Sequence, residues 1–147
     1  MYLLDSQVVF DLFSRDENRA IFQWLAEAGR DVRQLFVSVI SLGQIAHAIE
    51  DLPPPERNHW RRLFQEGRRV LEDRGSLIDV DMAIVDVWES SLRGARLIDV
   101  AGAEEELGED DRLIIATAIA RNYVLVAPGS RLIEEIAERT TLAIHAL

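Results

Sequence analysis

The sequence contains no cysteine and no lysine, so all 16 basic residues are arginines. Without cysteine the chain cannot form disulfides, use a thiol nucleophile or bind zinc through thiolates, and this absence is typical of a protein from the reducing cytoplasm. Without lysine the P-loop nucleotide-binding proteins are excluded, because their motif places a lysine on the phosphates. Receiver-type phosphoacceptor domains, which also use a lysine beside their acids, are disfavoured.

Long apolar runs and net positive charge are also missing. No apolar run approaches membrane-spanning length, and the first residues lack the basic-then-apolar layout of a signal peptide, so we expect a cytoplasmic protein with no membrane segment. The three histidines show no metal-ligand spacing. The formal net charge of −10 makes nucleic-acid binding through bulk charge unfavourable and suits a partner segment that carries arginines instead.

The pattern along the chain predicts one α/β domain over residues 1–147. Short β-rich runs predict strands over residues 2–4, 35–40, 77–80, 123–127 and 141–144. Helical patterns cover residues 6–13, 17–29, 41–50, 56–74, 82–97, 109–121 and 131–139, with a loop or frayed turn over 99–108. Strands that alternate with helices indicate a mainly parallel sheet covered on both faces, in a three-layer α/β/α sandwich.

Residues 109–127 organise this arrangement. Three acids open the stretch, an almost wholly apolar run of helix length follows, and a short apolar strand ends it. A helix that is apolar on nearly every side must be buried on nearly every side. Its acidic start would lie at the carboxyl edge of the sheet, where open α/β folds bind their ligands.

Three polar residues fall just after predicted strands or at helix starts: Asp5, Gln44 and Asp111. The topology could bring them together at one sheet edge. Carboxylates that share such a crevice suit Mg²⁺ or Mn²⁺, which take oxygen ligands and usually keep several waters. A cation of this kind activates water at neutral pH and offsets the charge of a phosphodiester.

Each of these residues also has a purely structural interpretation. Asp111 is favoured at a helix N-terminus by capping and by the helix dipole. Gln44 closes the sequence Ser41-Leu42-Gly43-Gln44, which matches a capping box in which the glutamine bonds back to the cap. Asp5 ends an interior strand and needs a partner, which could be an arginine, backbone N–H groups or a metal ion.

The predicted helix over residues 56–74 concentrates positive charge, with Arg61 and Arg68 as candidates for a rim that binds RNA phosphates. The alternative is a solvated face whose arginines pair with acids on the same helix.

Four segments carry a resemblance to a known family. They are Tyr-Leu-Leu-Asp-Ser-Gln-Val-Val (2–9), Ser-Val-Ile-Ser-Leu-Gly-Gln-Ile (38–45), Asp-Arg-Leu-Ile-Ile-Ala-Thr-Ala (111–118) and Tyr-Val-Leu-Val-Ala (123–127). In this order and spacing they resemble the PIN-domain nucleases, in particular the VapC-type toxins of bacterial toxin–antitoxin pairs. The resemblance covers essentially the whole chain.

The resemblance implies a PIN-like sandwich, an Mg²⁺ or Mn²⁺ site and endonucleolytic cleavage of RNA. It makes Asp5 and Asp111 the metal ligands, with Gln44 as a third catalytic position. Asp110, which like Glu109 flanks Asp111, and Ser6 are accessory candidates. It also implies homodimers that are inhibited by a small antitoxin wrapped around the toxin.

Two departures from the family pattern weaken the expected site. The glutamate of the second motif is Gln44, and the last motif reads Ala-Pro-Gly-Ser-Arg-Leu over residues 127–132, so that Leu132 stands where an acid is expected and Ala127 where a hydroxyl is expected. On a helix Glu134 would point about 200° away from position 132, so we do not expect it to substitute. The usual four acids are reduced to two.

A depleted site of this kind should bind its cation weakly, because losing even supporting groups of a metal site costs about 10–100-fold in affinity or activity. Either the chain cleaves RNA slowly, or it is a non-catalytic PIN-like binding module whose acidic crevice holds an arginine-rich peptide or another protein chain. An unrelated small α/β fold whose acids merely cap helices is a third interpretation.

Overall fold

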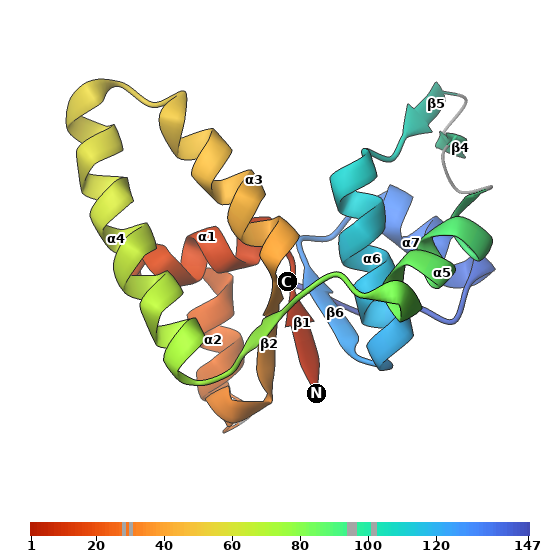
Figure 1. Ribbon diagram of the computed structural model, residues 1–147, viewed down its shortest axis with the longest axis horizontal. Helices are drawn as coiled ribbons and strands as arrows, with labels where there is room; N and C mark the ends of the chain where they lie inside the picture. Colours follow the sequence, from red (N-terminus) through yellow and green to blue (C-terminus); the bar gives the residue numbers. More distant parts are fainter. Residues whose placement is uncertain (28, 30, 94–96, 101–102) are drawn as a thin grey trace.

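A computed structural model describes residues 1–27, 29, 31–93, 97–100 and 103–147. Its centre is a sheet of five parallel strands in the order β3-β2-β1-β6-β7 (Figure 1). The strands are β1 (Tyr2–Leu4), β2 (Leu35–Ser38), β3 (Leu77–Ile78), β6 (Val124–Ala127) and β7 (Ala143–Ala146). The first strand of the chain therefore lies in the middle of the sheet, between β2 and β6.

Helices cover both faces of the sheet, as the sequence predicts (Figure 1). One face carries α1 (Ser6–Ser14), α2 (Ala20–Glu27), α3 (Val39–Glu50) and α4 (Pro54–Asp73), with the short 3₁₀ helix η1 (Val32–Gln34) before β2. The other carries α5 (Met82–Ser90), α6 (Glu109–Arg121) and α7 (Arg131–Arg139). No helix among the described residues is long and apolar enough to cross a membrane.

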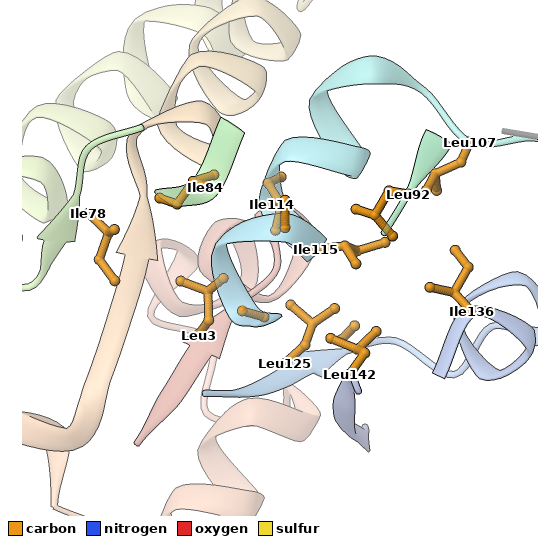
Figure 2. Packing of buried hydrophobic residues seen from close by; sticks show 13 residues of the cluster. Leu3, Ile78, Ile84, Leu92, Leu107, Ile114, Ile115, Leu125, Ile136 and Leu142 are labelled. Carbon is orange, nitrogen blue, oxygen red and sulfur yellow. The ribbon is translucent and has the colours of Figure 1, made fainter. Parts of the chain in front are cut away.

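Alternating side chains of the central strands fill two separate cores. Leu3 and Leu125 point to the α5–α7 side, where Figure 2 shows them packed beside Ile114 and Ile115. Leu4 belongs to the core on the α1–α4 side. This division follows from the two-residue period of a strand, and it means that both faces of β1 and β6 are buried.

Helix α6 lies between the sheet and α5, and its middle, from Ile114 to Ala118, is buried. The helix begins after Gly108 and ends where Asn122 adopts a left-handed conformation with φ 54°. Asparagine tolerates this conformation better than most residues, and its N–H bonds to the carbonyl of Ile119 at 3.1 Å. The prediction of a buried helix followed by an interior strand is confirmed.

One predicted segment is wrong. Where the sequence predicts a helix over 82–97 and a loop over 99–108, α5 ends at Ser90, and β4 (Leu97–Val100) pairs antiparallel with β5 (Ala103–Glu106). Residues 94–96 and 101–102 of those predictions lie outside the described residues. The acidic composition of β5 argues against a strand, and pairing with β4 overrides that local preference.

Several boundaries also shift by a few residues. β2 ends at Ser38 rather than at residue 40, β3 spans two residues rather than four, and β7 begins at Ala143 rather than at residue 141. The second helix is shorter than the predicted 17–29, at Ala20–Glu27, and residue 28 of that prediction lies outside the described residues. The long fourth helix starts at Pro54, where a proline ring is pre-organised for the first turn.

The contact between α1 and α4 offers a test of this packing. A Cβ added at Gly67 would come under 3.0 Å from three ring atoms of Phe13, which is buried. We expect Gly67→Ala to destabilise the fold by about 1–3 kcal/mol, because a packed ring must move. Gly43 lies inside α3 with nothing within 4 Å of an added Cβ, so Gly43→Ala should stabilise by about 0.5–1 kcal/mol. Urea unfolding measures both, and equal effects would contradict the packing of α4 on α1.

Candidate functional site

Asp5 stands where β1 ends and α1 begins. Its backbone N–H donates to the carbonyl of Val126 on the neighbouring strand at 2.9 Å, which extends the sheet by one residue. Its carboxylate caps α1 by accepting from the backbone N–H of Gln7 at 3.4 Å. The sequence left an arginine, backbone N–H groups or a metal ion open as partners of this carboxylate. In the structure its partners are backbone N–H groups.

Asp111 is the third residue of α6. The N-cap of that helix is Gly108, so no side chain caps it, and Asp111 lies in a first turn with Glu109 and Asp110. Negative charge is favourable there because of the helix dipole. Its carboxylate, however, bonds across the molecule, since Oδ1 accepts from the Nε2 amide of Gln44 at 2.9 Å. Capping therefore does not account for this side chain.

The capping-box prediction for Gln44 is wrong. The N-cap of α3 is Ser38, whose hydroxyl accepts from the N–H of Ile40 at 3.2 Å. Ser41 consequently lies inside the helix and is fully buried, and Gln44 lies more than one turn beyond the N-cap Ser38. Its side chain is thus free to reach α6. The Oε1 atom of Gln44 is buried and has no hydrogen-bond partner.

Asp5 and Asp111 line the same small cavity, of about 160 Å³. Most of the remaining lining is aliphatic: Leu107, Ile114, Ile115, Leu125, Leu132 and Ile133, with Ser130 the other polar residue. Leu132, which stands where the family pattern has an acid, therefore lines the same cavity as the two carboxylates. Glu134 does not line this cavity but a smaller one beside β7, of about 10 Å³.

Burial raises the pKa of the Asp5 carboxyl, and the charge of Asp111 raises it further. The backbone N–H groups of Gln7 and Ser6 act in the opposite direction and lower that pKa. The net upward shift comes mainly from burial, so the cavity disfavours the ionised form of Asp5. Within the described residues, no group of three or more His, Asp or Glu side chains is arranged to hold a metal ion.

A second, more open hollow of about 450 Å³ adjoins this site. It is lined by Ser6, Gln7, Phe10, Gly43, Gln44, Ile45, His47, Ala48 and Asp110, and we call it the α1–α3 groove. The accessory candidates Ser6 and Asp110 line this groove rather than the carboxylate cavity. Gln44 lines the groove and bonds to a residue of the cavity, so the two hollows meet at that bond.

The two candidate rim arginines lie on α4, away from both hollows. Arg61 pairs with Glu50 of α3 at 2.6 Å, and Arg68 pairs with Glu72 one turn along its own helix at 2.7 Å. Both side chains are about half exposed. The alternative interpretation, a solvated face whose arginines pair with acids on the same helix, therefore holds for Arg68. Arg61 differs because its acid lies on the neighbouring helix α3.

Sequence reasoning missed Arg112, which fixes the start of α6. Its guanidinium is buried, pairs with Glu109 at 3.0 Å, donates to the carbonyl of Leu92 at 3.1 Å and lies over the ring of Trp88 at 5.0 Å. These contacts tie α6 to the end of α5 and so hold the adjacent Asp111 in place. The available signal was an arginine directly before the apolar run of a helix expected to be buried.

This sequence matches the family model of the PIN domain over residues 2–138. The chain therefore belongs to the PIN-domain family. The resemblance drawn from the four motifs is confirmed, and so is the α/β/α sandwich that it implies.

Solved structures share this fold over nearly their whole length. VapBC2 from Rickettsia felis bound to a DNA fragment from its promoter is 18% identical, with 99% of this chain and 98% of that chain covered and a TM-score of 0.64. FitAcB from Neisseria gonorrhoeae is 15% identical, with 98% and 96% covered and a TM-score of 0.70. DNA-bound VapBC from Salmonella typhimurium is 18% identical, with 99% and 96% covered and a TM-score of 0.63. At these identities the likeness establishes the fold. No curated protein matches the chain in sequence.

The raised pKa of Asp5 gives a pH-dependent prediction for the ion-free protein in EDTA. A folded-state pKa above the unfolded value of 3.8 stabilises the fold at low pH, and that stabilisation is lost as pH rises through the folded-state pKa. Asp5→Asn keeps the cap but removes the buried charge. We therefore expect the melting temperature of Asp5→Asn to exceed that of wild type at pH 7, and this difference to close as the pH falls towards about 4.

The control is Asp16→Asn. Asp16 is exposed, and the backbone and side-chain amides of Asn18 lower its pKa, so this change should not raise the melting temperature at pH 7. A gain for Asp5→Asn that stays the same at every pH would contradict the assigned cause.

Proposed function

We propose that this chain is a VapC-type toxin component: an endoribonuclease that depends on Mg²⁺ or Mn²⁺ and whose carboxylate site is weakened. Membership of the PIN-domain family supports the nuclease origin. The observation that carries the proposal is the cavity shared by Asp5 and Asp111, which are 106 residues apart in the sequence and face one small volume.

The residues of the cavity fit a loosely held hard cation. Mg²⁺ is commonly bound through one or two carboxylates while it keeps several waters. The charge of Asp111 contributes to raising the pKa of Asp5, so a cation between the two carboxylates would relieve their repulsion. Asp5 and Asp111 would hold the ion, and the amide oxygen of Gln44 would reach it only if that side chain turned away from its hydrogen bond to Asp111. Such an ion lowers the pKa of water to yield a nucleophile and offsets charge on a phosphodiester.

Two residues account for the weakness of the site. Leu132 brings an aliphatic side chain to the cavity where the family pattern has an acid. Gln44 contributes no charge, and its N–H occupies one oxygen of Asp111. We therefore infer slow cleavage. The α1–α3 groove, with Ser6, His47 and Asp110 beside Gln44, is the open surface over which an RNA strand would reach the cavity.

An antitoxin is the partner that this assignment implies. The similar solved structures include complexes named VapBC and FitAB. The net charge of −10 suits a partner segment that carries arginine, and a guanidinium would pair with the carboxylates of the cavity. Homodimer formation and a cytoplasmic location belong to the same proposal.

A second candidate function is a PIN-like protein-binding module without catalysis. The aliphatic wall of the cavity and the Gln44–Asp111 hydrogen bond favour it, because a site with little negative charge can persist without an ion. The same crevice would then hold an arginine side chain of another protein. Measurements of ion binding and of RNA cleavage separate the two functions.

Ion affinity provides the first test. We expect isothermal titration of the wild-type protein to give Mn²⁺ or Mg²⁺ binding only in the millimolar range, because two carboxylates and waters make a poor site. Asp5→Asn should abolish that residual binding. Micromolar binding that Asp5→Asn removes would instead indicate a complete nuclease site.

Restoring the family's acids provides the second test. Because position 44 bonds to Asp111 and position 132 faces the same cavity, the double variant Gln44→Glu, Leu132→Asp should raise Mn²⁺-dependent RNA cleavage at least ~10-fold over wild type. Cleavage is followed on a labelled single-stranded RNA, with EDTA as the blank.

The matched control adds Asp111→Asn to the double variant and should return cleavage to the blank. If the double variant cleaves no faster than wild type, the site has been placed wrongly.

A further inference from the structure

The hydrogen bond between Gln44 and Asp111 joins α3 to α6 across 67 residues of sequence. It connects helices from the two faces of the sheet, at the carboxyl ends of β1 and β2. Its length of 2.9 Å is normal for an amide that donates to a carboxylate, and a charged acceptor makes such a bond stronger than a neutral one.

The orientation of the amide follows from the charge of Asp111. With Nε2 towards the carboxylate, Oε1 points into protein and is left buried without a partner. The reverse orientation would set that oxygen against the oxygens of Asp111. A buried acceptor without a donor is unfavourable, so the bond to Asp111 must outweigh this loss.

We propose that the amide N–H of Gln44 stands in for the cation at Asp111, so that the folded site needs no ion. This inference rests on the proposed function for the identity of the cation. The amide brings a partial positive charge to Oδ1 of Asp111, while the backbone N–H groups of Ser6 and Gln7 donate to Asp5. Each of the two acids thereby has a donor of its own.

An ion that enters the cavity must compete with this amide. It has to displace the N–H from Asp111 or turn the side chain so that Oε1, now unpaired, faces the ion. Gln44 thus acts on the ion through Asp111, and its hydrogen bond to that carboxylate weakens ion binding. A glutamate at the same place would instead add a third negative charge beside Asp111 and Asp5, and such a cluster needs a cation to be stable.

Three variants of the full chain separate these effects. Gln44→Glu replaces the N–H by a charge, and Gln44→Met keeps the length of the side chain but removes the donor. The matched control is Gln65→Glu, which adds the same charge on an exposed position of α4. Melting temperatures are measured in EDTA and in about 0.1 mM Mn²⁺, and Mn²⁺ affinity by titration calorimetry.

In EDTA we expect Gln44→Glu to melt at least about 5 °C below wild type, and Gln44→Met to melt below wild type by a smaller margin. About 0.1 mM Mn²⁺ should raise the melting temperature of Gln44→Glu while leaving wild type and Gln65→Glu unchanged. Gln44→Met should bind Mn²⁺ about tenfold more tightly than wild type, because the competing donor is gone. A purely structural role would not tighten ion binding.

Three results would overturn the inference. The first is a melting temperature of Gln44→Met in EDTA equal to that of wild type. The second is weaker Mn²⁺ binding by Gln44→Met than by wild type, and the third is a large rise in the melting temperature of wild type in about 0.1 mM Mn²⁺. If Gln44→Glu does not fold in EDTA but folds in Mn²⁺, that result supports the inference. If Gln44→Glu folds in neither condition, the measurements on Gln44→Met decide. None of these measurements uses RNA, so an absence of cleavage would count against the proposed function alone.

Discussion

The parallel pairing of β1 with β2 on one side and β6 on the other is the constraint on which the site depends. Parallel strands end at one edge of a sheet, and the helices that connect them must start at that edge. Asp5 therefore ends β1 at the same edge where α3 and α6 begin. Because both faces of β1 are buried, the strand cannot slip by one residue without moving Leu3 and Leu4 to the wrong cores.

Most of the fold can be predicted from the sequence, because its signals are local. The strand at residues 2–4 and the helix at 131–139 have the predicted bounds, and the buried helix of residues 109–121 is evident from its apolar run. Failures occur where contacts outside the segment decide. Strand β5 forms because it pairs with β4, and this pairing overrides the acidic composition of β5. The end of β2 depends on which of two serines caps the next helix.

That choice of serine also separates what could be predicted of the site from what could not. Asp5 and Asp111 are recognisable from their places after a strand and at a helix start. The partner of Gln44 is not, because the sequence at Ser41 offers a local capping interpretation while the structure uses Ser38 and frees the glutamine for α6. Arg112 was not predicted for a related reason, since its partners Trp88 and Leu92 lie in α5 and just after it, far from Arg112 in the sequence.

The two departures from the family pattern are physically coupled in this structure. An aliphatic residue at position 132 brings no negative charge to the cavity and makes its wall less polar. Burial is the largest cause of the raised pKa of Asp5. Once only two acids remain, their charge can be met by backbone N–H groups on Asp5 and by one amide on Asp111. A glutamine at position 44 provides that amide, whereas a glutamate would restore the need for a cation. The loss of one acid thus makes the loss of the other favourable for a chain that folds without an ion.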